Sequence, residues 1–385
     1  MFKSFFLGGF EGSVGHNCHR QWFDSISRTQ HDRFIDDDYA RLKKNEIHAV
    51  RECVRWPLVD GGRGFDFSTL DLLIRAGRAA GITTIYDLFH FGYPPSLDLL
   101  STEFTKRFSE YCYQVAKRVY AHSDGTCYFT PVNEPSYFAW AAGEVGLFAP
   151  HFTHRGNEVK IAVVKAAIDG CNAIWAACPK ARIVSVDPFC RVVPSIENED
   201  ELHRAEVFNS NVVFQSWDML SGRVMPELGG SPRHLDIVGI NYYSNNQWIL
   251  DASYAPLPEN DPRRMPLRRI AWTVWKRYGR QIIFSETSEV GEKRADWIKT
   301  LVHEVQAMRT ADIPIEGVCW YPVLEMSEWH TPDRWTPMGL WDLDHESSSM
   351  RRMPYKPALR ALRAAESLLR VREEATGGLV TCESW

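Results

Sequence analysis

Short apolar runs recur along the chain, and longer stretches with helical spacing separate them. An apolar run of a few residues that is bounded by polar or turn-forming residues is typical of a buried strand. We expect eight strands, at residues 5–10, 49–54, 83–89, 127–132, 182–186, 236–241, 281–285 and 317–321. Apolar residues three and four positions apart predict helices between them, including residues 102–121, 158–177 and 292–309 and a last helix from Pro357.

The stretch after Ser68 illustrates the helical pattern. Leu70, Leu73 and Ile74 follow the spacing of one helix face, and Gly81 stands where a helix is commonly closed. Ser68 precedes this face and is therefore the expected N-cap.

Strands that alternate with helices predict a parallel sheet, and eight such units predict a closed (β/α)₈ barrel. No linker or low-complexity tract divides the chain, so we expect one domain over residues 1–385. An open doubly wound sheet would carry a glycine-rich phosphate loop after its first strand. The stretch "GGFEGSVG" is rich in glycine, but no helical pattern follows it directly. We interpret it as a loop at the mouth of the barrel.

The composition is that of an ordinary globular protein, with 44% hydrophobic and 24% charged residues and a net charge of −5. Basic residues are scattered, so no nucleic-acid partner is predicted, and no apolar run is long enough to span a membrane. The nine cysteines have no framework spacing, and Cys53, Cys171 and Cys319 lie in apolar runs as expected of buried thiols. With no leader pattern at the N-terminus, these features predict a cytoplasmic location.

Polar residues follow the predicted strands where each strand ends. In a barrel of this class the C-terminal strand ends meet at one mouth, which carries the chemistry. The sequence therefore predicts one site from the residues at these ends, namely Glu11, Arg55, Trp56, His90, Asn133, Glu134, Asn241, Tyr242, Tyr243, Glu286, Trp320 and Tyr321.

Two of these residues are glutamates, Glu134 in "TPVNEP" and Glu286 after "QIIFS". Cleavage of a glycosidic bond needs one protonated carboxyl group and one ionised carboxylate. A cation beside the second group keeps it ionised. A turn glutamate would be the plain alternative for Glu134, and Glu289 competes with Glu286.

Four blocks in order resemble glycoside hydrolase family 1 and its clan of (β/α)₈ retaining β-glycosidases: "TPVNEP", "GINYYS", "IIFSETSE" and "WYPVLEMSEW…GLWDLD". The resemblance implies that Glu134 is the acid/base and Glu286 the nucleophile. It implies that Asn133 binds the sugar 2-hydroxyl and that His90 binds another hydroxyl.

The resemblance extends to further residues. It implies that Arg55 lies beside the nucleophile, and that Tyr243, with Tyr242 as a competitor, bonds to it. It implies that Trp320 is a sugar platform and that Glu328 and Trp329 bind the outer hydroxyls. The family's strand-one glutamine has no clear counterpart here, and Glu11 or His16 could take its place. A carboxylate at 328 favours an unphosphorylated sugar.

These features predict a retaining exo-β-glycosidase that hydrolyses a small β-glycoside or oligosaccharide. The chemistry needs no metal or organic cofactor, and we interpret "GHNCHR" as a lining loop because no fourth metal ligand accompanies it. A transglycosylase with the same carboxylate pair and a non-catalytic sugar-binding barrel remain alternatives. The sequence leaves open whether the chain forms a homo-oligomer.

Overall fold

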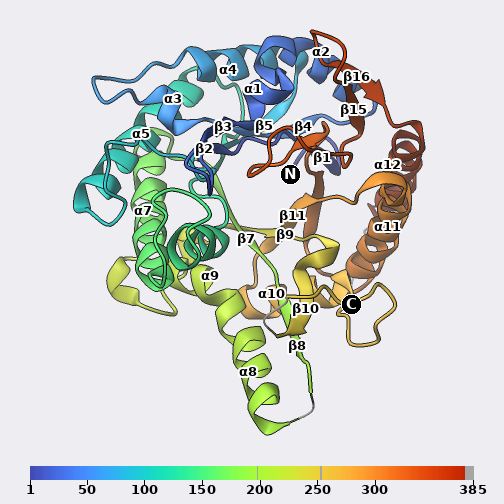
Figure 1. Ribbon diagram of the computed structural model, residues 1–385. Helices are drawn as coiled ribbons and strands as arrows, with labels where there is room; N and C mark the ends of the chain where they lie inside the picture. The colour runs from blue at the N-terminus through green and yellow to red at the C-terminus, as the bar shows by residue number, and fades with distance from the viewer. Residues whose placement is uncertain (197, 252–253, 378–385) are drawn as a thin grey trace, which may run out of the picture.

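Eight parallel strands close into a barrel, and helices surround it (Figure 1). The computed structural model describes residues 1–196, 198–251 and 254–377. Around the barrel the order is β1 (Phe6–Gly9), β12 (Ile315–Trp320), β11 (Gln281–Thr287), β9 (Ile237–Asn241), β7 (Arg182–Pro188), β6 (Tyr128–Thr130), β5 (Thr83–Asp87) and β4 (Ala49–Cys53), which pairs again with β1. All eight predicted strands are present, and the predicted (β/α)₈ fold is confirmed.

The helices that follow the strands include every one predicted from periodicity. They are α1 (Ser25–Thr29), α2 (His31–Lys44), α3 (Trp56–Val59), α4 (Ser68–Ala80), α5 (Thr102–Ala121), α6 (Pro135–Phe138), α7 (Gly156–Ala177), α8 (Glu199–Ser210), α9 (Gln215–Leu220), α10 (Leu267–Tyr278), α11 (Arg294–Thr310) and α12 (Lys356–Gly377). Figure 1 shows α8 extending away from the ring, next to β8.

Four small two-stranded sheets lie in the loops. They pair β2 (Val14–His16) with β3 (Trp22–Asp24), β8 (Arg191–Pro194) with β10 (Gln247–Leu250), β13 (Met326–Ser327) with β14 (Trp335–Thr336), and β15 (Trp341–Asp344) with β16 (Arg351–Pro354). The glycine-rich stretch, residues 8–15, runs from the end of β1 into β2 of the first hairpin, and no helix follows it directly, in agreement with its interpretation as a loop.

The predicted cap of α4 is wrong. Phe67 occupies the N-cap position, and the helix begins at Ser68. The backbone N–H of Ser68 donates to the Asp66 carboxylate at 2.9 Å, so Asp66 satisfies an N–H group that starts the helix. The predicted end is confirmed, because Gly81 closes α4 with φ of 68°.

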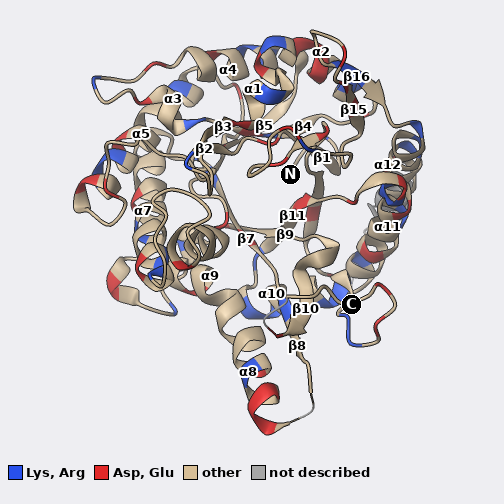
Figure 2. Cartoon of the chain, in the orientation of Figure 1, with Lys and Arg blue, Asp and Glu red and all other residues tan. Residues whose placement is uncertain are grey.

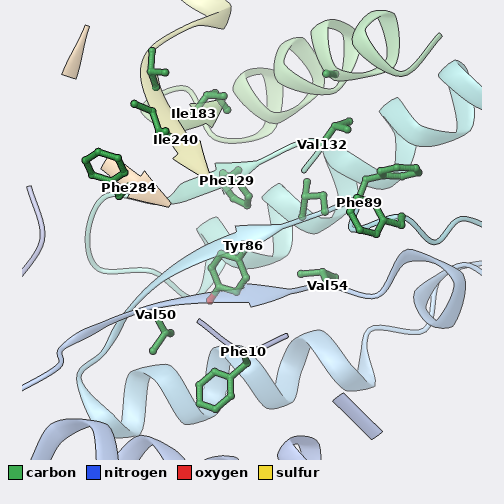
Figure 3. Close-up of a cluster of buried hydrophobic side chains, with 14 of the residues drawn as sticks. Phe10, Val50, Val54, Tyr86, Phe89, Phe129, Val132, Ile183, Ile240 and Phe284 are labelled. Carbon is green, nitrogen blue, oxygen red and sulfur yellow. The ribbon is translucent and has the colours of Figure 1, made fainter. Parts of the chain in front are cut away.

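The barrel separates two apolar regions, as the alternation of strand side chains requires. Small and branched residues such as Ala49, Ile85 and Ile283 fill its interior. The opposite faces of the strands pack against the helices through a second set of apolar residues, which include Val50 and Phe129 (Figure 3). On β4 this alternation turns Val50 outward, so its neighbour Arg51 points into the barrel.

Gly9 makes room for one of the interior side chains. A Cβ atom at this position would lie 2.1 Å from Cδ2 of Tyr321. Any larger residue at position 9 would displace the Tyr321 ring, which lies inside the barrel.

Charged side chains of both signs are interspersed over the surrounding helices, without a basic stripe (Figure 2). Within the described ranges, no helix has the length and apolar character needed to cross a membrane. Eight cysteines of the described part have free thiols, and Cys53, Cys171 and Cys319 are buried as predicted.

Candidate active site

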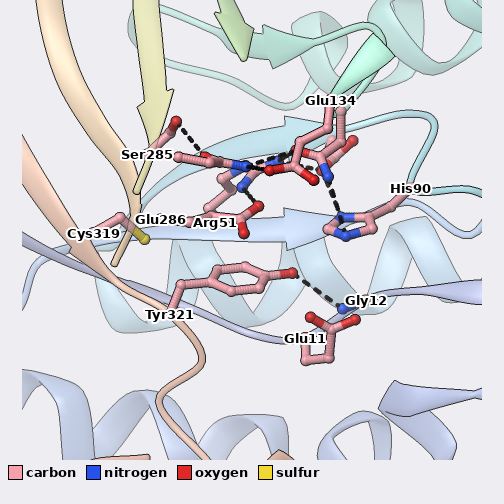
Figure 4. A network of polar contacts seen from close by, with 12 residues as sticks. Glu11, Gly12, Arg51, His90, Glu134, Ser285, Glu286, Cys319 and Tyr321 are labelled. Atoms are coloured by element: carbon pink, nitrogen blue, oxygen red, sulfur yellow. Dashed lines mark hydrogen bonds and ion pairs between the residues drawn. The ribbon is translucent and has the colours of Figure 1, made fainter. Parts of the chain in front are cut away.

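Glu134 and Glu286 lie in one polar network at the mouth of the barrel (Figure 4). Glu134 is the N-cap residue of α6, with a left-handed backbone (φ 49°), and Pro135 follows it as the first helical residue. Its backbone N–H donates to the carbonyl of Val186 at 3.1 Å, which ties the turn to β7. Glu286 lies near the end of β11, and the register shift after Phe284 places it opposite Asn241 of β9.

Arg51 is the cation at the centre of this network. Its Nη1 donates to Oε1 of Glu286 at 2.5 Å, and its Nη2 donates to Oδ2 of Asp87 and to Oδ1 of Asn133, both at 2.6 Å. The side chain is 1% exposed. Buried charges are stable when they are paired and hydrogen-bonded in this way. Arg51 therefore fixes the relative positions of Glu286 on β11, Asp87 on β5 and Asn133 after β6.

The prediction that Arg55 accompanies the nucleophile is wrong. Arg55 lies beyond the end of β4 and donates to the Asp24 carboxylate at 2.7 and 3.0 Å, with Asp32 at 3.4 Å. The strand residue that points into the barrel is Arg51, two positions after the interior residue Ala49. The period-two alternation of "AVREC" was the signal that would have identified it.

Asn241 stands at a predicted strand end, but no role was assigned to it from the sequence. Its Nδ2 donates to Oε1 of Glu134 at 2.8 Å, and its Oδ1 accepts from the Ser285 hydroxyl at 2.7 Å. The second contact fixes the amide so that its N–H groups face Glu134. Burial, with the charge of Glu286 next, raises the pKa of Glu134 to about 8.

Glu286 has a different environment. Burial raises its pKa as well, but the Arg51 guanidinium is the first of the groups that oppose this rise. Tyr243 donates its hydroxyl to Oε2 of Glu286 at 3.0 Å, as predicted for this tyrosine. Glu286 therefore has a cation and a hydroxyl donor, whereas Glu134 has a neutral amide. This asymmetry favours the proton on Glu134 and the negative charge on Glu286.

His90 and Asn133 are held together beside Arg51. Because Oδ1 of Asn133 accepts from Arg51, its Nδ2 is the donor toward Nε2 of His90, 3.2 Å away. The ring proton then lies on Nδ1, which is 3.0 Å from Oδ2 of Asp87. Burial opposes a charge on His90, and the hydrogen bond and charge of Asp87 outweigh it and raise its pKa. Asp87 was missed by the sequence reading.

The prediction of Trp320 as a sugar platform is wrong. Trp320 is 0% exposed, packs in the outer core, and donates its indole N–H to the carbonyl of Met338 at 3.0 Å. Its neighbour Tyr321 points into the barrel instead, where its ring lies parallel to that of His90 at 6.2 Å between centroids. The alternation along β12 puts one aromatic ring on each side of the barrel wall.

Glu11 and Trp329 meet at the same mouth. The Trp329 indole N–H donates to Oε1 of Glu11 at 3.3 Å, and the backbone N–H of Ser13 donates to the same oxygen at 3.0 Å. His16 lies farther along on β2, where it lines a cavity of about 220 Å³ together with Phe91. Of the two candidates for the place of the strand-one glutamine, Glu11 is the one that contacts Trp329, a predicted sugar-binding residue.

Glu328 lies on the short hairpin of β13 and β14. The Thr336 hydroxyl donates to Oε1 of Glu328, and the Glu328 backbone N–H donates to the carbonyl of Arg334 at 3.0 Å. These contacts hold Glu328 within its own loop, and its contact with a sugar remains a prediction.

A (β/α)₈ barrel with two buried glutamates at its mouth is thus the class that the geometry defines. The sequence matches no protein-family model and no curated protein. Solved structures do match. A family 1 β-glucosidase from Thermotoga maritima has a TM-score of 0.74 at 15% identity, covering 94% of this chain and 97% of its own. The AHE enzyme from Alicyclobacillus herbarius has a TM-score of 0.78 at 18% identity, covering 95% of this chain and 98% of its own.

At these identities the likeness establishes the shared fold. The predicted resemblance to the family 1 β-glucosidase barrel is confirmed at that level.

Proposed function

We propose that the protein is a retaining exo-β-glycosidase that acts on a small β-glycoside. The observation that carries this proposal is the unequal surroundings of the two glutamates. Glu286 is bonded to Arg51 and Tyr243, and Glu134 is bonded to Asn241. A retaining glycosidase needs such a pair, with one carboxyl group protonated and the other ionised.

In the first step Glu286 attacks the anomeric carbon. A bond forms between its carboxylate oxygen and that carbon while the bond from the carbon to the leaving oxygen breaks. Glu134 gives its proton to the leaving oxygen, so the aglycone departs as a neutral alcohol.

In the second step Glu134, now a carboxylate, takes a proton from water. The water oxygen bonds to the anomeric carbon, the ester bond to Glu286 breaks, and the sugar leaves with its original β configuration. This chemistry requires the two carboxyl groups to be about 5 Å apart.

The surrounding residues have supporting tasks in this proposal. Arg51 keeps Glu286 ionised, and Tyr243 holds its second oxygen. Asn133 binds the 2-hydroxyl of the sugar, and His90 binds a neighbouring hydroxyl. Trp329 and Glu11 bind the far side of the ring.

One comparison supports a sugar substrate, and the cysteines bear on the proposed location. The β-glucosidase from Thermotoga maritima, with a TM-score of 0.75, is in complex with glucoimidazole in one solved structure. The described cysteines have free thiols, which agrees with the proposed cytoplasmic location.

A transglycosylase would use the same carboxylate pair and differ in the acceptor of the second step. A barrel that only binds sugar does not need an ionised nucleophile, so it gains nothing from burying Arg51 beside Glu286 at a cost in free energy. The Arg51 contacts therefore favour catalysis.

The test compares the wild type with Glu286→Gln on a panel of aryl β-glycosides. We expect aglycone release by the wild type and a loss of at least roughly 1,000-fold in kcat in the variant. Glu289→Gln is the matched control, because Glu289 lies three residues away outside the network, and it should retain activity. Equal loss in both variants, or undiminished release by a folded Glu286→Gln protein, would contradict the proposal.

A further inference from the structure

Glu11 is a further carboxylate at the site, beside Glu134, Glu286 and Asp87, and it neither donates a proton nor attacks the sugar in the proposed mechanism. The side chain follows β1 and is 6% exposed. Both of its contacts, from Ser13 and Trp329, are N–H groups that donate to the same oxygen, Oε1. This arrangement holds the carboxylate in one orientation.

Glu11 lies close to the reacting groups. Figure 4 shows its carboxylate on the same side as the His90 ring and the Tyr321 hydroxyl. Its negative charge contributes to the raised pKa of His90, after burial and Asp87, and to the raised pKa of Tyr243, after burial and the two catalytic glutamates. The backbone N–H of the next residue, Gly12, donates to the hydroxyl of Tyr321 at 3.4 Å, so Glu11 lies at the mouth of the barrel that also holds Glu134 and Glu286.

Glu11, like Glu134, has no cation of its own, whereas the other two carboxylates of the network do. Asp87 and Glu286 share the Arg51 guanidinium. In the described part of the chain, no lysine, arginine or histidine side chain forms an ion pair with Glu11. Its second oxygen, Oε2, accepts no hydrogen bond from described residues, and it is not sealed from solvent.

A buried carboxylate without a cation costs free energy that a ligand can recover by supplying the positive charge. A neutral sugar hydroxyl would donate one hydrogen bond to Oε2, whereas an ammonium group would donate a charge-assisted one. An anionic sugar, such as a uronic acid, would meet repulsion from Glu11.

We propose that Glu11 is a specificity residue that binds an ammonium group of the sugar, so that the preferred substrate is a β-glycoside of an amino sugar. This inference rests on the proposed glycosidase function and names its substrate class. The inference is based on the position of the Glu11 carboxylate, which is held in one orientation without an ion pair and lies at the same barrel mouth as Glu134 and Glu286.

The experiment measures kcat/KM on matched aryl β-glycosides. The panel contains the neutral glucoside, its four analogues with an amino group in place of the hydroxyl at carbon 2, 3, 4 or 6, and the glucuronide. Each is tested with the wild type, with Glu11→Gln, and with Glu259→Gln. Glu259 is a surface residue, 62% exposed and paired with Lys293, so its variant removes the same charge from outside the site.

We expect the wild type to prefer one amino glycoside over the glucoside by roughly 10- to 100-fold, the value of one charge-assisted hydrogen bond. Glu11→Gln should abolish that preference and raise the relative rate on the glucuronide, and Glu259→Gln should change neither. Wild-type preference for the neutral glucoside over every amino analogue would overturn the inference. An unchanged order of substrates in Glu11→Gln would overturn it as well.

A binding measurement distinguishes a failure of this inference from a failure of the proposed function. Calorimetry compares glucosamine, its 3-, 4- and 6-amino isomers and glucose as free ligands of the wild type and Glu11→Gln. If no glycoside is cleaved, the proposed function fails, and tighter binding of one amino sugar that requires Glu11 would still support the role of Glu11 in binding an ammonium group. If glycosides are cleaved but no amino sugar is favoured in either assay, the function stands and the inference fails.

Discussion

Replacing Arg51 with lysine tests the electrostatic design of the site. Lysine keeps the positive charge but has a single ammonium group in place of the planar guanidinium, so it cannot reach Glu286, Asp87 and Asn133 together. Removing the charge altogether would leave two carboxylates buried without a cation at a cost of about 3–5 kcal/mol. Lysine is therefore the variant that separates catalysis from folding.

The expected effect follows from the contact with Glu286. A hydrogen bond to a charged group contributes about 1.5–3 kcal/mol, which corresponds to a decrease of roughly 10- to 100-fold in kcat/KM. Arg51 also opposes the rise in the pKa of Glu286. When that opposition weakens, the pKa of Glu286 rises, and the acidic limb of the pH–activity profile moves to higher pH.

The assay is a pH profile of kcat/KM on an aryl β-glycoside, with Arg55→Lys as the matched control. Arg55 is paired with Asp24 and Asp32, so its variant should lower the melting temperature without moving the acidic limb. A shift of that limb in Arg55→Lys and none in Arg51→Lys would refute the assignment.

Three further predictions follow. Activity should decline as pH rises through about 8, because the proposed acid Glu134 must be protonated. Glu134→Gln should remove this alkaline limb of the pH profile and lower kcat by roughly 100-fold or more on substrates with poor leaving groups. An unchanged alkaline limb in the variant would contradict this role. His31 lies between Asp38 and Glu52 at 2.9 and 3.0 Å, and although burial opposes it, their charges and hydrogen bonds raise its pKa to about 9. Because the folded value exceeds the unfolded one, the stabilisation is complete below pH 6.5 and is lost as pH rises through about 9. Urea unfolding should therefore show wild-type stability decreasing by on the order of 3 kcal/mol across that window, and His31→Gln should lack the decrease. Gly9→Ala should lower the free energy of unfolding by about 1–3 kcal/mol, because the added methyl group overlaps the Tyr321 ring; a neutral substitution in a denaturant titration would show that β1 can move away.

The barrel could be predicted from the sequence because each strand is a short apolar run with a helical pattern after it. Local pattern also located Glu134 and Glu286, since each follows such a run directly. The structure places the Tyr243 hydroxyl within hydrogen-bond distance of Glu286, which is the predicted contact.

The errors at Arg55 and Trp320 have one physical cause. Both were chosen because they stand where a strand ends, but the direction of a side chain depends on the register of the closed barrel. Arg51 and Tyr321 take the interior positions instead. Asn241 had no predicted role for a related reason, because its contact with Glu134 reaches past the intervening strand β7 and depends on the directions of both side chains.

The configuration of the sugar at the moment of its release tests the central claim most directly. Proton NMR during hydrolysis of an aryl β-glycoside distinguishes the two anomers before they equilibrate. The paired glutamates at the barrel mouth predict that the β-anomer forms first and the α-anomer grows later by mutarotation. An α-anomer as the first product would contradict double displacement through Glu286.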